Sequence, residues 1–124
     1  MIILLRHVMD LESLRKYCRS LPHVTEDVKW GNDLCFLIAK KMFCVACLDQ
    51  SAPVRMSFKC TPEKFSELIE ENGITPAAYM ARNHWISLER WDALRDSEIK
   101  SLVRESYGLV LAKLPKKMQA KLSH

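Results

Sequence analysis

The stretch Leu34-Cys-Phe-Leu-Ile-Ala-Lys-Lys-Met-Phe-Cys-Val-Ala-Cys-Leu48 decides the fold of this 124-residue chain. Two apolar runs, residues 34–38 and 41–48, lie on either side of the dipeptide Ala39-Lys40. Both runs are apolar at odd and even positions, which is typical of strands that are buried on both faces. Because a two-residue connection joins antiparallel strands, the stretch predicts a β-hairpin at the centre of an antiparallel sheet.

The run after the hairpin alternates strictly between apolar and polar side chains. Residues 54, 56, 58 and 60 are apolar, whereas Arg55, Ser57 and Lys59 occupy the positions between them. This pattern predicts a half-buried strand with a basic stripe on its outer face. A weaker strand signal, around residues 28–30, precedes the hairpin.

Three helices are expected around these strands. Asp10 is a plausible N-cap for the first, which would run to about Ser20. The dipeptide Thr61-Pro62 is a strong start for the second, and Gly73 would end it.

The third helix would be capped by Asp96 or Ser97 and carries an apolar stripe from Ile99 to Leu114. Gly108 interrupts it at a cost of roughly 1 kcal/mol relative to alanine, so we expect close packing there. A short basic turn over residues 116–121 would follow. Residues 74–83 are expected to form an ordered loop and residues 85–88 a last short strand.

This order of elements predicts an α+β protein: a two-layer α/β arrangement with an antiparallel sheet and helices packed on one face. Residues 9–124 are expected to form a single domain. Two interpretations of residues 1–8 remain open: an N-terminal extension from an upstream start codon, which we favour, or a strand on the sheet edge.

Composition narrows the class of protein. Hydrophobic residues make up 48% of the chain and charged residues 27%, as in ordinary globular proteins. No apolar run approaches the roughly 20 residues of a membrane span, so no membrane association is expected. The five cysteines are an odd number without a secretory signal, which favours reduced thiols in the cytoplasm.

The sequence offers little that supports catalysis. Cys44-Val-Ala-Cys47 has the spacing of a redox or zinc motif, but on a strand these thiols would face opposite sides. Phosphate-binding loops are rich in glycine, and the chain has only three glycines. We therefore expect no enzyme, no cofactor and no bound metal.

A local basic patch is the main candidate for a binding site, because the net charge of +4 is modest. Such a patch could contact phosphates and stack on bases. An ordinary solvated sheet face is the alternative, and His84 is more simply explained as structural. The candidate nucleic-acid-binding residues are Lys40, Lys41, Arg55, Lys59, Arg82, Asn83 and His84, and Lys29 is a further candidate for the basic patch.

Several segments together resemble the MmcQ/YjbR family over about residues 9–122. They are Trp30-Gly31, Phe36, Lys41-Met42-Phe43, Ser57-Phe58-Lys59, Gly73-Ile-Thr-Pro-Ala-Ala-Tyr79, Ala81-Arg-Asn-His-Trp-Ile86 and Ser106-Tyr107. The resemblance implies a CyaY-like or secretion-chaperone-like fold and a "double wing" DNA-binding function without catalytic residues. One departure is the turn Ala39-Lys40, where the family often has glycine; a positive φ there would be strained.

Three functions follow as expectations. The first is DNA binding through the basic stripe, the Lys40-Lys41 turn and residues 82–84. The second is a protein-interaction or self-associating module, such as a homodimer, which predicts an exposed apolar patch beside the loop from Tyr79 to Trp85. The third is a small-molecule or metal-binding protein with a pocket lined by Tyr79, His84 and a cysteine.

Overall fold

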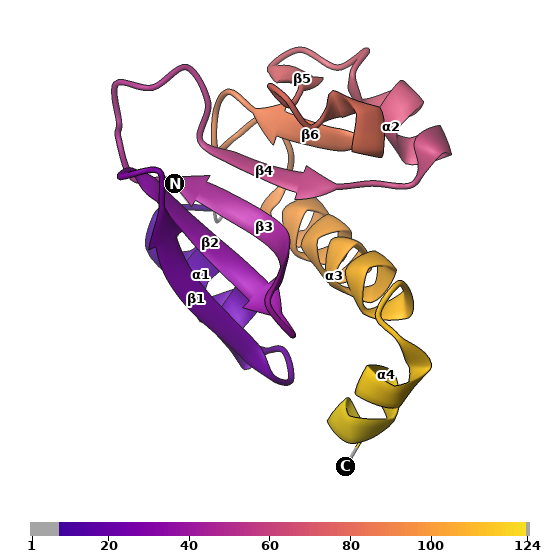
Figure 1. The fold of residues 1–124 in the computed structure, drawn as a ribbon. Helices are drawn as coiled ribbons and strands as arrows, with labels where there is room; N and C mark the ends of the chain where they lie inside the picture. Colours follow the sequence, from indigo (N-terminus) through magenta and orange to yellow (C-terminus); the bar gives the residue numbers. More distant parts are fainter. Residues whose placement is uncertain (1–7, 124) are drawn as a thin grey trace, which may run out of the picture.

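The computed structural model describes residues 8–123, which form a six-stranded antiparallel sheet with helices against it (Figure 1). The strand order is β1-β2-β3-β4-β6-β5. The strands are β1 (Val24–Lys29), β2 (Asp33–Ile38), β3 (Lys41–Cys47), β4 (Met56–Lys59), β5 (Ile74–Pro76) and β6 (Trp85–Leu88). The helices are α1 (Leu11–Ser20), α2 (Pro62–Leu68), the 3-10 turn η1 (Ala81–Asn83), α3 (Asp96–Ala112) and α4 (Lys116–Leu122). The α+β class and the antiparallel sheet expected from the sequence are confirmed.

The central hairpin is the predicted one. All residues of β2 after Asp33 are buried, and β3 is buried from Phe43 to Ala46. The turn residues Ala39 and Lys40 have φ values of 48° and 67°. Both therefore adopt the left-handed conformation that favours glycine, so this turn carries the strain that the sequence suggested.

Two strands differ from expectation. β1 begins at Val24 and pairs along its whole length with β2, so it is longer than the weak signal around residues 28–30 indicated. Ile74–Pro76, expected as loop, forms the edge strand β5, which pairs with β6. A proline is compatible with this strand because an edge position leaves one side without ladder partners.

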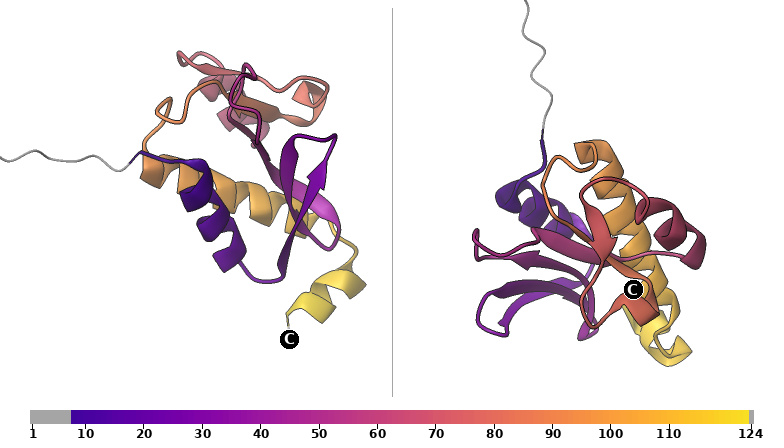
Figure 2. Two further views of the ribbon diagram at one scale, coloured as in Figure 1. Left: turned by 90° about the vertical axis from the view of Figure 1, so that its left-hand side faces the viewer. Right: turned by 90° about the horizontal axis from the view of Figure 1, so that it is seen from above.

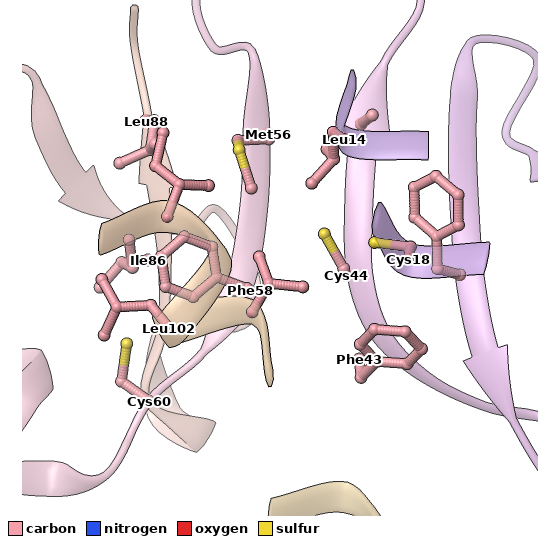
Figure 3. Packing of buried hydrophobic residues seen from close by; sticks show 14 of the residues in the cluster. Leu14, Cys18, Phe43, Cys44, Met56, Phe58, Cys60, Ile86, Leu88 and Leu102 are labelled. Atoms are coloured by element: carbon pink, nitrogen blue, oxygen red, sulfur yellow. The ribbon is translucent and has the colours of Figure 1, made fainter. Parts of the chain in front are cut away.

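Helices α1 and α3 lie on the same side of the sheet, as both views of Figure 2 show. The Asp10 side chain accepts a 2.7 Å hydrogen bond from the Ser13 amide, which confirms it as the N-cap of α1. Between this layer and the sheet lies the main core, where Phe58 of β4 is fully buried close to Ile86 and Leu102 (Figure 3).

The Ser106 hydroxyl of α3 bridges two strands. It donates to the Phe43 carbonyl at 2.6 Å and accepts from the Lys59 amide at 3.0 Å. Because Cys44 pairs with Phe58, Phe43 and Lys59 would be the next partners in the β3–β4 ladder. The hydroxyl of a fully buried side chain thus replaces a direct hydrogen bond at the point where β3 and β4 separate.

The helices correct three expectations. Arg95 is the N-cap residue of α3, so Asp96 is already helical and neither Asp96 nor Ser97 is the cap. α2 ends at Leu68, five residues before Gly73, although Gly73 does have a positive φ of 84°. A Cβ on Gly108 would meet nothing within 4 Å, so the close packing expected there is absent.

The outer face of the sheet, opposite the helices, is largely apolar rather than basic. A second buried cluster of Cys35, Leu37, Val45, Ala77 and Trp85 lies on this face. Ser57 is 8% exposed and Arg55 is partly buried, so the expected basic outer stripe does not form. The stripe fails for two reasons: Ala77 of the segment before β6 packs on this face, and Arg55 is held by carbonyls of the β3–β4 loop.

Residues 1–7 of the expected N-terminal extension lie outside the described part of the chain, as does His124. Val8 is exposed, and Met9 is buried against the main core. Among the helices of residues 8–123, none is long and apolar enough to cross a bilayer.

Candidate binding groove on the outer face of the sheet

A groove of about 1030 Å³ opens on the outer face of the sheet. It crosses the junction between β3 and β4, the strands that Ser106 holds apart at one end. Its walls come from the β1–β2 turn, the loop between β3 and β4, and the segment from β5 towards η1. The lining residues are Trp30, Asp33, Val45, Cys47, Pro53, Val54, Met56, Ser57, Thr75, Pro76, Ala77, Ala78, Tyr79, Met80, Ser87 and Glu89.

Two aromatic side chains stand on the groove walls and are open to solvent. Trp30 is 70% exposed and Tyr79 is 106% exposed. Their φ values are 53° and 65°, so both occupy the left-handed region. Bulky residues rarely adopt this conformation, and such positions cluster at binding and active sites.

The turns explain how the two aromatics are placed. Trp30 is the first of three residues between β1 and β2, and Gly31 beside it also has a positive φ. Tyr79 is the third residue of a turn closed by a hydrogen bond from the Met80 amide to the Ala77 carbonyl. A positive φ at the third position is the feature of type II turns, where glycine is usual.

The polar groups on the floor of the groove are uncharged and hydrogen bond to each other. The Ser57 and Ser87 hydroxyls, on paired positions of β4 and β6, lie 2.7 Å apart and hydrogen bond to each other. Both residues are buried. Because these hydroxyls hydrogen bond to each other, the floor adds to them mainly the apolar surface of Val45, which pairs with Ser57.

The family model YjbR matches residues 19–109. The chain belongs to the YjbR family. The comparison with curated proteins found no match.

Two solved structures share the YjbR fold of this chain. The Deinococcus radiodurans protein DR2400, which has a DUF419 domain, is similar with a TM-score of 0.84 and 26% identity. That match covers 96% of this chain and 92% of DR2400. A Pseudomonas syringae protein is similar with a TM-score of 0.68 and 23% identity, over 82% of this chain and 98% of its own. The likeness to the latter concerns the fold alone.

The basic residues proposed from sequence lie apart in this YjbR fold. Lys40 and Lys41 are exposed at the β2–β3 turn. Arg55 precedes β4 and Lys59 ends it, so roughly 13 Å of strand separates them. The Arg55 guanidinium donates to the carbonyls of Asp49 and Ala52, which directs it into the β3–β4 loop.

The three residues of the segment Arg82-Asn83-His84 have different environments. Arg82 and Asn83 are exposed on η1. His84 is partly buried, and its ring packs edge-on against Phe65 of α2 with a centroid distance of 5.6 Å. This contact gives His84 a structural role between η1 and α2. Trp85 is buried in the outer cluster.

The cysteines face two different environments. Cys44 lies in the main core beside Cys18 (Figure 3). Cys47 lines the groove on the other face, so the two thiols of the Cys44-Val-Ala-Cys47 motif face opposite sides of the sheet. Burial raises the pKa of the Cys60 thiol to about 12 and raises that of Cys44 as well. Among residues 8–123, no three metal-ligating side chains gather as a site would require.

Sequence reasoning missed most of the groove. Trp30 was noted only as part of a segment shared with the family, and Asp33 and Glu89 were not singled out. Of the expected pocket of Tyr79, His84 and a cysteine, Tyr79 and Cys47 line the groove and His84 does not. One local signal existed for Trp30: an aromatic residue followed by Gly31 between two strands marks a turn rather than a core position.

Proposed function

We propose that this YjbR-family chain is a non-catalytic binding module that holds an apolar segment of a protein partner in the outer-face groove. One observation carries the proposal: Trp30 and Tyr79, both exposed on left-handed backbone, stand on the walls of an apolar groove of about 1030 Å³. Aromatic residues that are exposed before binding are the usual anchors of protein interfaces.

The cost of these two conformations supports a binding role. A bulky residue in the left-handed region costs on the order of 1–3 kcal/mol. An almost fully exposed side chain recovers little of that cost through packing within the chain. A partner that covers Trp30 and Tyr79 would bury large aromatic area, about 25 cal/mol for each Å² removed from water.

The environments of His84, Cys44 and Cys60 support the part of the proposal that assigns no catalytic role. The His84 ring packs on Phe65 and is half-buried. The raised pKa values of Cys44 and Cys60 keep those thiols protonated at neutral pH, and a thiol is a much weaker nucleophile than a thiolate.

The neutral dye Nile red, which fluoresces in apolar sites, tests the groove. We expect its emission to rise with the wild-type chain and to fall to background with the double variant Trp30→Asn/Tyr79→Gly. Asparagine and glycine both tolerate the left-handed backbone, so the turns should keep their shape. The matched control is Met118→Ala on α4, which removes another exposed apolar side chain and should leave the emission unchanged. Equal emission from all three proteins would overturn the proposal.

Binding of a duplex DNA is the second candidate function. One observation favours it: Lys59 lies beside Lys113 at the end of α3, and burial together with this second cation lowers the pKa of Lys59. Two lysines held together form a natural site for an anion such as a backbone phosphate.

Fluorescence anisotropy with a labelled 20-base-pair duplex tests this second function. We expect affinity to fall steeply with salt and to weaken in Lys59→Gln and Lys113→Gln, while Lys16→Gln on the exposed face of α1 serves as the control. A duplex that shows no anisotropy change at low salt would exclude this candidate.

A further inference from the structure

The charged residues that line the outer-face groove are all acidic. Asp33 and Glu89 are the charged residues among its lining side chains, although the whole chain holds 19 lysines and arginines against 15 acids. Lys29 pairs with Asp33 across the β1–β2 ladder, but it does not line the groove. Arg55 is turned into the β3–β4 loop by its two carbonyl partners and does not line the groove either. The charged side chains that line the groove therefore have the sign opposite to the net charge of the molecule.

Asp33 is placed as a recognition group. It begins β2, three residues after Trp30, and is partly buried. Within residues 8–123 its carboxylate has neither an ion-pair partner nor a hydrogen-bond donor, and burial raises its pKa. Burial removes water from this carboxylate, and no protein donor replaces that water. A positively charged ligand would therefore stabilise the carboxylate more than a neutral one would.

Glu89 lies across the groove from Asp33. It follows β6, and its amide donates to the Gly73 carbonyl at 2.8 Å, which fixes the backbone beside β5. Its side chain is exposed and on the groove lining. Together the two acids frame the apolar floor from the β2 side and from the β6 side.

The two wall aromatics suit the same ligand. The faces of tryptophan and tyrosine rings attract a lysine ammonium or an arginine guanidinium, by about 0.5–1 kcal/mol at exposed sites. Apolar floor, aromatic walls and acidic ends are thus complementary to an apolar segment that carries a cation.

We propose that the partner segment held in this groove carries a lysine or arginine between apolar residues, with its charge placed near Asp33 and Glu89. The inference rests on the proposed function and specifies the chemistry of its partner. It also separates the groove from the Lys59–Lys113 region, because a polyanion would be repelled by the two carboxylates and attracted only to the lysines.

Three blocked peptides that differ at one position test the inference: acetyl-Leu-Phe-Lys-Leu-amide and its analogues with Gln or Glu in place of Lys. Their dissociation constants are measured from amide chemical shifts of the whole ¹⁵N-labelled chain at low salt. We expect shifts at groove residues and an affinity for the Lys peptide that is roughly threefold to tenfold higher than for the Gln peptide, with the Glu peptide weakest.

Isosteric variants assign the effect to the two carboxylates. Asp33→Asn and Glu89→Gln should each reduce the preference for Lys over Gln by roughly two- to fivefold, because each removes one charge without changing shape. Glu70→Gln, an exposed acid after α2 and outside the groove, should leave the preference unchanged. The amide spectrum of each variant reports whether it is folded, and either groove variant alone suffices for the test.

The outcomes separate the two proposals. Equal affinities for the three peptides, or tightest binding of the Glu peptide, would overturn the charge preference and leave the binding groove intact. The absence of shifts at groove residues with all three peptides would overturn the proposed function itself. A Lys preference that survives in both Asp33→Asn and Glu89→Gln would assign the preference to other groups and contradict this inference.

Discussion

Tyr79 carries a large side chain at a backbone position that glycine usually occupies. Its φ of 65° is strained, and its side chain is fully exposed, so its removal loses no packing. We expect Tyr79→Gly to stabilise the fold by roughly 0.5–1 kcal/mol, since the relief of strain exceeds the added entropy of the unfolded chain. Urea denaturation measures the change.

The neighbouring Ala78 provides the matched control for Tyr79→Gly. Ala78 is also exposed, but it is not among the residues with positive φ. Ala78→Gly should therefore destabilise the fold by roughly 0.5–1 kcal/mol, because it adds only unfolded-state entropy. If both substitutions destabilise equally, Tyr79 is unstrained and the main support for its binding role is lost.

Local sequence patterns predicted residues whose roles are set by their neighbours in the chain. The Asp10 cap and the strain of the Ala39-Lys40 turn both depend on a few adjacent residues, and both are as expected. The exposure of Tyr79 depends instead on where its segment crosses the sheet, which no local pattern encodes. Tyr79 and Trp85 are aromatic residues six positions apart, yet Trp85 at the start of β6 is buried and Tyr79 is fully exposed.

At the scale of elements, Gly108 lowers the stability of α3, and no packing contact requires a glycine there. It lies within the helix, its Cβ would meet nothing within 4 Å, and it has no positive φ. We expect Gly108→Ala to stabilise the protein by about 1 kcal/mol, the difference in helix propensity. Thermal denaturation followed by circular dichroism checks the increase.

Gly73 offers the opposite case to Gly108. Its φ is 84°, and a Cβ would lie 3.0 Å from the Arg90 guanidinium. Gly73→Ala should therefore lower the melting temperature while Gly108→Ala raises it. A loss of stability in Gly108→Ala would show that α3 needs the flexibility of glycine at that turn.

Ser106 couples α3 to the sheet through one hydroxyl. Ser106→Ala leaves the Phe43 carbonyl and the Lys59 amide buried without their partner, which costs roughly 1–3 kcal/mol. Ser101→Ala, at an exposed position of the same helix, should change stability little. If β3 and β4 close and form a direct hydrogen bond in Ser106→Ala, the loss would shrink towards zero, and urea denaturation of both variants distinguishes the two outcomes.

Elements with strong periodicity or caps were predictable, and elements defined by distant pairing were not. The central hairpin and α3 follow from patterns within one segment. β5 has three residues, one of them proline, and it is a strand only because β6, which begins at Trp85, pairs with it. The expected basic stripe failed in part for the same reason, since Ala77 of the segment between β5 and β6 packs on the outer face.

At the scale of the whole molecule, the cysteines differ in how far solvent reaches them. Cys18, Cys35, Cys44 and Cys60 are buried, whereas Cys47 is partly exposed on the groove. The pKa of Cys60, raised to about 12, further lowers its reactivity because the thiolate is the reacting form.

We therefore expect a thiol reagent such as 5,5′-dithiobis(2-nitrobenzoate) to react rapidly with one thiol per native chain and with all five in denaturant. Cys47→Ala should abolish the rapid phase, whereas Cys35→Ala, which removes a buried thiol of the same face, should preserve it. A peptide that occupies the groove should slow the reaction of Cys47, because it covers the surface through which the reagent approaches. Rapid reaction of several thiols under native conditions would mean that the outer cluster opens readily, and the groove would then be a transient feature rather than a preformed site.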